Sequence, residues 1–308
     1  MLKTLAVFLS LLFILNIGFG STSMSLTALI DSPVLWALRL PSAIICILAG
    51  GVLALSGFAT QTLFKNSLAT PYTLGVASSA SLGAILAMSL GLGWSMVSLS
   101  ALVFSLLSIL LLLFAFKTFK FDYLRLLLLG IALNLFSSSL ISIIQVMSGK
   151  LDLSLFLSWI MGSVSVVGYD SVYILCFAFI LLIFVMFKYL RELMIMSVEG
   201  HDSFTRGFDP SKVRSILLLT ISLSVGLLVS QLGPIGFVGL VIPHLTSRIV
   251  VFKGNQLIFG NCMLGGSFIL FADLVNRSLL SDYGLPVGVL ITVFGAPVLA
   301  VFLWKKSI

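Results

Sequence analysis

Charged residues are scarce in this chain of 308 residues. Only 9% of the residues are Asp, Glu, Lys or Arg, whereas a soluble domain has about 25%. There are also only three cysteines and two histidines. Cys46, Cys176 and Cys262 lie within apolar runs, at spacings that match neither a zinc site nor a disulfide framework. The sequence therefore predicts no metal site, and the shortage of charge argues against a water-soluble protein.

The chain also lacks the short motifs that carry common catalytic chemistry. It has no phosphate-binding loop of the form GxxxxGK(S/T), so it has no means of its own to hydrolyse ATP. HExxH, GxSxG and paired intramembrane aspartates are absent as well, which leaves intramembrane hydrolysis without its chemistry. We therefore expect a protein that is not an enzyme, that needs no cofactor of its own and that takes energy from a partner.

Apolar residues, by contrast, make up 60% of the chain, and the mean hydropathy is +1.24. A helix needs ~20 apolar residues to cross a bilayer. On this criterion the sequence predicts ten spans in a single transmembrane domain, 1–308. They cover residues 4–20, 42–63, 71–92, 94–116, 126–147, 170–188, 214–232, 235–252, 256–274 and 285–304. The first span follows Lys3 as a signal peptide would, but we expect a retained helix.

One stretch, 188–214, departs from this pattern, because it holds nine of the 27 charged residues. Basic residues near span ends collect on the cytoplasmic side of a membrane. With ten spans and both termini in the cytoplasm, 14 Lys and Arg lie inside and 3 lie outside, namely Arg39, Lys150 and Arg277. The stretch 188–214 is then cytoplasmic, and the net charge of +7 reflects this topology rather than nucleic-acid binding.

Segment 151–168 is the difficult part of the span count, because it is apolar but short. Treating it as an eleventh span reverses everything after it and leaves 6 basic residues inside against 11 outside. We therefore expect a short interfacial or re-entrant helix at the outer face. The predicted fold class is an all-α, polytopic membrane protein with ten transmembrane helices and this one extra helix.

The first informative motif covers residues 39–83 and reads RLPSAIICILAGGVLALSGFATQTLFKNSLATPYTLGVASSASLG. Its proline stands in the first turn of the second span, where it is tolerated. The small residues from Gly50 to Gly57 form a helix face that permits close contact with another helix. Later blocks are GPIGFVGLVIPHLTSR at 233–248, ADLVNR at 272–277, GLPVG at 284–288 and FGAPVLAVF at 294–302.

These blocks resemble the permease subunits of binding-protein-dependent ABC importers for iron–siderophore complexes, haem and vitamin B12, which are type II importers. The family patterns are RLPR, LAGAxLAxSG, Q and NPLAxPxxLG, then GxIGFVGLxxPHxxR, ADxxAR with ELPxG, and LGAPxF. The resemblance covers nearly the whole chain. It implies ten helices in a multi-pass protein of the bacterial inner membrane, embedded in lipid, with both termini in the cytoplasm.

The resemblance also implies partners. The family's permeases work as dimers with the pathway between the two subunits, and a soluble binding protein docks outside in the periplasm. Two ATPase subunits, which bind ATP and Mg, dock inside against the loop between the sixth and seventh helices. The resemblance leaves open which cargo is carried, and whether the dimer contains two copies of this chain or one copy and a sister chain.

The coupling segment of the family usually reads LGxxxAxxLG and corresponds here to VEGHDSFTRG at 198–207. The implied ATPase-coupling residues are Glu199, Gly200, His201, Asp202, Ser203, Phe204, Arg206 and Gly207. Glu199 replaces the usual glycine and Arg206 replaces the usual leucine, which suggests an ATPase partner with complementary charges. The alternative is that this segment is merely a solvated connector.

On the outer face, Arg39 and Arg277 match arginines that meet acidic residues of the binding protein. Ser42 stands where a second arginine is frequent, and Gly284 stands where a glutamate is common. We therefore expect docking that is weaker, or that depends more on nonpolar contact. The alternative is that both arginines only anchor span ends at the lipid headgroups.

A further group of residues matches the family's motif, pathway and gate positions. For His244 we favour a structural hydrogen bond at a broken helix, and a gate role for Ser78 is a hypothesis. Asn134, Gln145 and Asn276 either line a polar passage or bond one helix to another. The motif, pathway and gate residues are Gln61, Asn66, Pro71, Gly75, Ser78, Gly236, Pro243, His244 and Arg248.

Two other transporter classes compete with the importer. A secondary transporter driven by an ion gradient would have helices broken at Gly or Pro in both halves, as at 66–75 and 233–243, but it generally needs an intramembrane carboxylate or ion site. Asp273 is the only acidic candidate near a span. The zinc and manganese branch of ABC permeases shares the architecture but should lack the RLP and GFVGLxxPH blocks.

Overall fold

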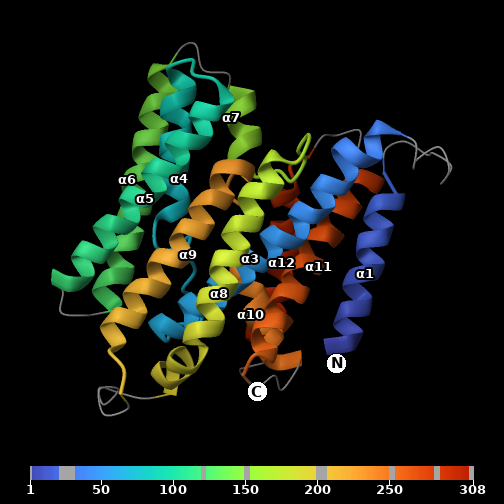
Figure 1. Ribbon diagram of the computed structural model, residues 1–308. Helices are drawn as coiled ribbons and strands as arrows, with labels where there is room; N and C mark the ends of the chain where they lie inside the picture. Colours follow the sequence, from blue (N-terminus) through green and yellow to red (C-terminus); the bar gives the residue numbers. More distant parts are fainter. Residues whose placement is uncertain are drawn as a thin grey trace.

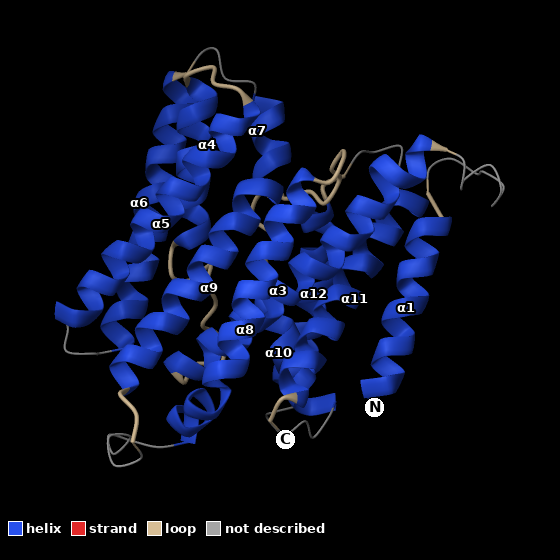
Figure 2. Cartoon of the chain, in the orientation of Figure 1, coloured by secondary structure: helices blue, strands red, loops and turns tan. Residues whose placement is uncertain are grey.

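The protein is a bundle of helices packed side by side (Figure 1). The computed structural model describes residues 2–20, 32–118, 123–148, 153–198, 207–249, 254–280 and 285–304. Within these ranges the regular structure is helical, without a strand (Figure 2). The predicted all-α fold is therefore confirmed.

Six helices are long and apolar enough to cross a membrane. They are α3 with the π-helical turn η1 before it (Leu40–Phe64 and Leu35–Arg39), α5 (Trp94–Thr118), α6 (Tyr123–Met147), α8 (Asp170–Val198), α9 (Pro210–Leu232) and α11 (Gln256–Leu279). Four apolar helices are shorter, namely α1 (Leu2–Gly18), α4 (Val76–Ser89), α10 (Val238–Ile249) and α12 (Val287–Trp304). The six long and four shorter helices match the ten predicted spans in order, while ten complete crossings remain a prediction.

Two helices, α4 and α10, are much shorter than predicted. α4 has 14 residues and α10 has 12, which at 1.5 Å per residue is ~21 Å and ~18 Å, less than the ~30 Å of a bilayer core. Non-helical chain precedes each of them, at 65–75 before α4 and at 233–237 before α10. We call these segments the first break and the second break. They explain why the predicted spans 71–92 and 235–252 are only partly helical.

α3 lies at the centre of the bundle and packs against α8, α9, α10 and α11 (Figure 1). Its small-residue face makes this possible. A Cβ atom on Gly50 would lie 2.2 Å from the carbonyl oxygen of Gly265, and one on Gly57 would lie 1.9 Å from that of Gly239. Both glycines are therefore needed for the close approach of α3 to α11 and α10.

The helix ends divide between two faces of the bundle. The N and C labels stand at the lower end in Figure 1, where α8 also ends and α9 begins, whereas the short helix α7 (Leu153–Ile160) lies at the upper end. Segment 161–168 leads away from α7 and is tied by backbone bonds to three elements at that end. Its Ser163 N–H donates to Leu232 of α9, and its Gly168 N–H donates to Ala37 of η1. The carbonyl oxygen of Gly162 accepts from the N–H of Gly288 in α12. The predicted extra helix is thus confirmed, and it lies opposite the termini.

Candidate functional site

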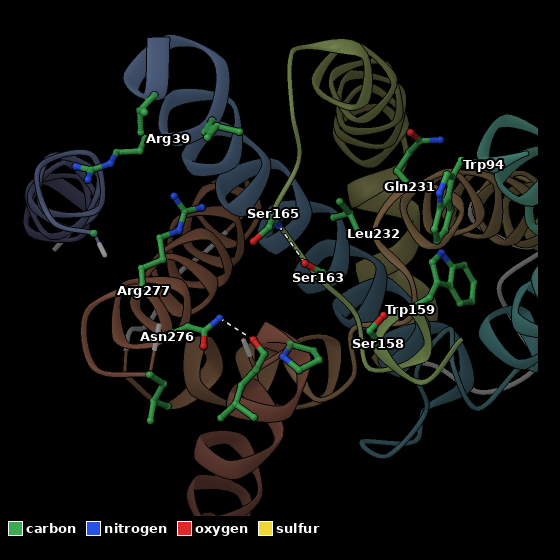
Figure 3. Close-up of a pocket in the computed structure, with 16 residues that line it drawn as sticks. Arg39, Trp94, Ser158, Trp159, Ser163, Ser165, Gln231, Leu232, Asn276 and Arg277 are labelled. Atoms are coloured by element: carbon green, nitrogen blue, oxygen red, sulfur yellow. Dashed lines mark hydrogen bonds between the residues drawn. The ribbon is translucent and has the colours of Figure 1, made fainter. Parts of the chain in front are cut away.

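A cavity of about 740 Å³ lies where α1 ends and α3 begins, which is the upper end of the bundle in Figure 1. Figure 3 shows the residues that line it. Figure 3 shows Arg39 and Arg277 on one side of this upper cavity, and Trp94 and Trp159 on the other. Serine and amide side chains line the space between them, among them Ser165 and Gln231. This volume is in the range of small-molecule and side-chain binding pockets.

Arg39 lies at the start of the central helix and is only 4% exposed. Its Nη1 donates to the carbonyl oxygens of Ile17 and Gly18, at 3.0 and 3.1 Å. These oxygens belong to the last turn of α1, where carbonyl groups lack a partner within the helix and a positive charge is favourable. Arg39 therefore fastens α1 to η1 as well as lining the upper cavity.

Arg277 is held by a fully buried acid on the same helix. Its Nε lies 2.9 Å from Oδ2 of Asp273, one helical turn earlier. The same oxygen accepts a bond of 2.9 Å from the side-chain amide of Asn16 on α1, and both Asn16 and Asp273 are 0% exposed. The buried carboxylate is thus compensated by a charge and an amide, as burial requires.

The upper cavity carries a net positive charge among the described residues. Its two charged lining residues are Arg39 and Arg277, and Asp273 behind them contributes one negative charge. Two positive charges and one negative charge leave +1. An anionic group would therefore be favoured in this cavity over a cation.

Gln61 connects the two halves of the chain near the lower half of α3. Its Nε2 donates to the backbone oxygens of Gly239 and Leu240 on α10, at 3.2 and 3.3 Å. Pro243 explains the need for these bonds, because proline has no N–H to offer to the carbonyl of Gly239 four residues earlier. Nδ1 of His244 lies 2.9 Å from the oxygen of Leu240, so the structural interpretation of His244 fits its contact.

The first break is fixed by side chains from other elements. Asn134 of α6 donates to the carbonyl oxygen of Tyr72 at 3.0 Å and accepts a bond of 2.6 Å from Ser78 of α4. The hydroxyl of Tyr72 in turn accepts from the backbone N–H of Ile235 in the second break, at 2.8 Å. Gly75 adopts φ +83° where α4 begins, which a glycine accommodates without strain. The two breaks therefore touch through Tyr72, a residue that the sequence did not single out.

Of the remaining predicted motif residues, Asn66 and Pro71 belong to the first break, and Gly236 belongs to the second break. Oδ1 of Asn66 accepts the N–H of Leu68 within the first break, and Pro71 is buried in the turn that follows. A Cβ on Gly236 would meet nothing within 4 Å. The side chain of Arg248, near the end of α10, lies outside the described residues.

The lower end contains the edges of the predicted coupling segment. Residues 199–206, with Glu199, Gly200, His201, Asp202, Ser203, Phe204 and Arg206, lie outside the described residues, and Gly207 occupies a turn with φ +82°. Asp209 then caps α9, since its Oδ1 accepts the N–H of Ser211 at 2.9 Å. The guanidinium of Arg214 lies 5.5 Å from the ring centre of Phe116 on α5. The start of α9 is therefore anchored to its neighbour directly after the coupling segment.

Within the described ranges, no three His, Cys, Asp or Glu side chains come together. The three cysteines are free thiols.

Comparison with known proteins decides the family. The model of the FecCD transport family matches residues 8–305. The chain belongs to the FecCD transport family. It is 31% identical over 273 residues to the "Probable iron chelatin transport system permease protein" of Helicobacter pylori, covering 89% of this chain and 82% of that protein. It is 34% identical over 273 residues to the vitamin B12 import system permease BtuC of Yersinia pseudotuberculosis, covering 87% and 80%.

The solved structures place this FecCD chain in the same fold. The solved structure titled "An inward-facing conformation of a putative metal-chelate type ABC transporter" superposes with a TM-score of 0.89 at 28% sequence identity. The superposition covers 99% of this chain and 98% of the other. The fold is therefore that of a type II ABC importer permease, and the protein is a multi-pass membrane permease.

The predicted site residues of this FecCD chain gather in three places. Arg39 and Arg277 meet at the upper cavity, Gln61 meets the Pro243 helix, and Ser78 meets Asn134 at the first break. The sequence missed Asn16 and Tyr72. The signal for Asn16 was an amide within an apolar span, since polar groups there face protein rather than lipid.

Proposed function

We propose that this chain is the permease subunit of a binding-protein-dependent ABC importer that moves an iron complex, either siderophore or haem, or cobalamin across the inner membrane. The observation that carries the proposal is the match of nearly the whole chain to the FecCD transport family. The iron-chelate and vitamin B12 permeases among its relatives support this range of cargo. Both termini and segment 188–214 are assigned to the cytoplasm.

The energy comes from two ATPase subunits, because the chain has no nucleotide-binding motif. They act on the coupling segment 199–207, which joins α8 to α9. Two anchors support this assignment, namely the Asp209 cap and the cation–π contact of Arg214 with Phe116. Movement imposed on the segment is thereby passed to α9 and α5, which open the pathway alternately to the two sides.

The binding protein docks at the upper end, where acidic side chains of its surface meet Arg39 and Arg277. The charge of +1 at the upper cavity supports this orientation. Charge-assisted pairs of this kind steer and orient docking more than they add affinity. The two tryptophans opposite the arginines supply nonpolar contact, which suits a surface that lacks the second arginine at Ser42.

The pathway runs between this chain and a second permease subunit, with α6 at the interface. Only 17% of the apolar window of α6 is buried within this chain. The side chain of Asn134 is bonded inside this chain, but beyond it Ser138, Ser142 and Gln145 follow one another at helical spacing. These three residues form a polar stripe along one side of the helix. A polar stripe on a lipid-facing helix would be costly, so a water-filled pathway beside α6 accounts for it.

The rival transporter driven by an ion gradient is disfavoured by the surroundings of Asp273. A transported cation needs a carboxylate that is available to it. Asp273 is instead 0% exposed and bonded to Arg277 and Asn16. The carboxylate of Asp273 therefore has structural partners and is not available to a transported cation.

The test is reconstitution of the purified permease in liposomes, with and without the ATPase subunits and binding protein of its own transport system. We expect uptake of labelled ferric siderophore, haemin or cobalamin that requires all components and ATP. Uptake by the permease alone under an imposed proton or sodium gradient would overturn the proposal in favour of the rival.

A further inference from the structure

The last turn of α1 holds both arginines of the upper cavity. Residues 16–18 are consecutive, and each of them takes part. The carbonyl oxygens of Ile17 and Gly18 bind Arg39 directly. The third residue, Asn16, is linked to Arg277 through the carboxylate of Asp273. Oδ2 of Asp273 lies 2.9 Å from Nδ2 of Asn16 and 2.9 Å from Nε of Arg277.

Only the Nε edge of the Arg277 guanidinium is bonded to another residue in the described ranges. Its Nε is bound to Asp273, and its terminal Nη groups make no hydrogen bond within the described ranges. Its side chain is 18% exposed, compared with 1% for that of Asp273, and it lines the upper cavity. The guanidinium is planar and rigid, so fixing the Nε edge also fixes the direction of the Nη edge. The free edge is thereby presented to the cavity.

The Asn16–Asp273 contact joins α1 to α11 at a cost in stability, because it buries an amide and a carboxylate between two apolar helices. Both residues are fully buried, and Oδ1 of each has no hydrogen-bond partner within the described structure. Unpartnered buried oxygens cost stability, and an apolar pair of the same size would join α1 to α11 without that cost. The contact is therefore better explained by its effect on the position of Arg277 than by a contribution to helix packing.

We propose that Asn16 and Asp273 are positioning residues, which orient Arg277 toward an anion-accepting site in the upper cavity. The site takes an anionic group, because two arginines and one aspartate leave a net charge of +1. That this group is a carboxylate of the binding protein rests on the proposed function. The orientation of Arg277 by α1 does not rest on it.

Two substitutions of Asp273 separate positioning from charge. Asp273→Asn and Asp273→Leu both remove one negative charge and both are similar in size to aspartate. The asparagine keeps an oxygen that accepts from Nε of Arg277, and its amide can donate to Oδ1 of Asn16. The leucine offers neither group. A purely electrostatic role for Asp273 predicts equal effects, whereas a positioning role predicts different ones.

The measurement uses a reporter thiol, Ser165→Cys, on the wall of the upper cavity. In the permease purified into lipid nanodiscs, the reaction rates of an anionic and a cationic methanethiosulfonate are compared, with the native cysteines of the unmodified chain as background. One unit charge at ~8 Å in screened water changes this rate ratio roughly twofold to fivefold. Arg277→Gln should lower the ratio by this amount, which calibrates the reporter.

We expect Asp273→Asn to raise the anionic-to-cationic ratio, and Asp273→Leu to leave it clearly below that of the asparagine variant, because a released Arg277 samples other directions. Asn16→Leu changes no charge and should lower the ratio below that of the reporter chain. It provides the test if Asp273→Leu does not fold. Equal ratios for the two Asp273 variants, or an unchanged ratio in Asn16→Leu, would overturn the positioning role.

The same variants keep this inference distinct from docking. If the expected ratios are found but no binding protein associates with the permease, positioning holds and the docking proposal fails. If Arg277→Gln abolishes docking while both Asp273 variants show equal ratios, docking holds and positioning fails.

Discussion

The bond from Gln61 on α3 to the backbone of α10 allows a double-mutant test of the contact between these two helices, which we call the central seam. Gln61→Leu removes the donor to the carbonyl oxygen of Gly239, which Pro243 cannot replace. The oxygen of Leu240 keeps His244 as a partner at 2.9 Å. The loss is therefore that of one buried acceptor, about 1–3 kcal/mol. At about 2 °C per kcal/mol for a chain of this length, the unfolding midpoint should fall by roughly 2–6 °C.

Pro243→Ala supplies the missing N–H from within α10, so it should repair much of the defect. In the Gln61→Leu background we expect it to recover about 1 kcal/mol, while alone it should be close to neutral. Pro297→Ala is the matched control, since Pro297 interrupts α12 in the same way but lies outside this seam. Thermal unfolding of the purified permease in detergent measures all four combinations. Strict additivity of Gln61→Leu and Pro243→Ala would refute the reasoning.

Three further predictions follow from the coupling segment, the helix crossing and the contact between the breaks. Charge reversal at both Glu199 and Arg206 should lower ATP-driven uptake at unchanged permease levels in the membrane, and unchanged uptake would exclude the coupling assignment. Gly57→Ala should destabilise the permease by about 1–3 kcal/mol in thermal unfolding, because its Cβ would lie 1.9 Å from a backbone oxygen of α10. Gly18→Ala, which meets nothing within 4 Å, should be near neutral. Tyr72→Phe leaves a backbone N–H of the second break without its acceptor at 2.8 Å, which should cost about 1–3 kcal/mol in the same assay; no shift would mean that the breaks are not coupled through this hydroxyl.

Much of the fold could be predicted because apolar length and charge are strong signals in membrane proteins. The run from residue 94 to 116 was predicted as one span and is helical throughout. The short helix in 151–168 followed from the distribution of basic residues. Apolar composition failed at 71–75 and 235–237, where the chain is not helical. Turns buried in the bundle are as apolar as the helices beside them, so hydropathy does not distinguish the two.

The candidate site was predictable as a set of residues but not as a set of contacts. Arg39 was predicted from its motif as an outward docking group, and the structure adds that its guanidinium binds the end of α1. Asn16 and Asp273 are 257 residues apart in the chain, and no local pattern links them. Gln61 and Pro243 were likewise predicted separately, and only the packing of α3 on α10 shows that one compensates for the other.

The central claim is that this permease, which has no nucleotide-binding motif, is driven by ATP hydrolysis in partner subunits. Its most direct test measures uptake of a labelled iron chelate or cobalamin into liposomes that contain the permease with its ATPase subunits, while the ATPase turnover is recorded. The account predicts uptake that rises with ATP turnover and disappears when the ATPase subunits are omitted. Uptake that persists without them, driven by an ion gradient alone, would contradict it.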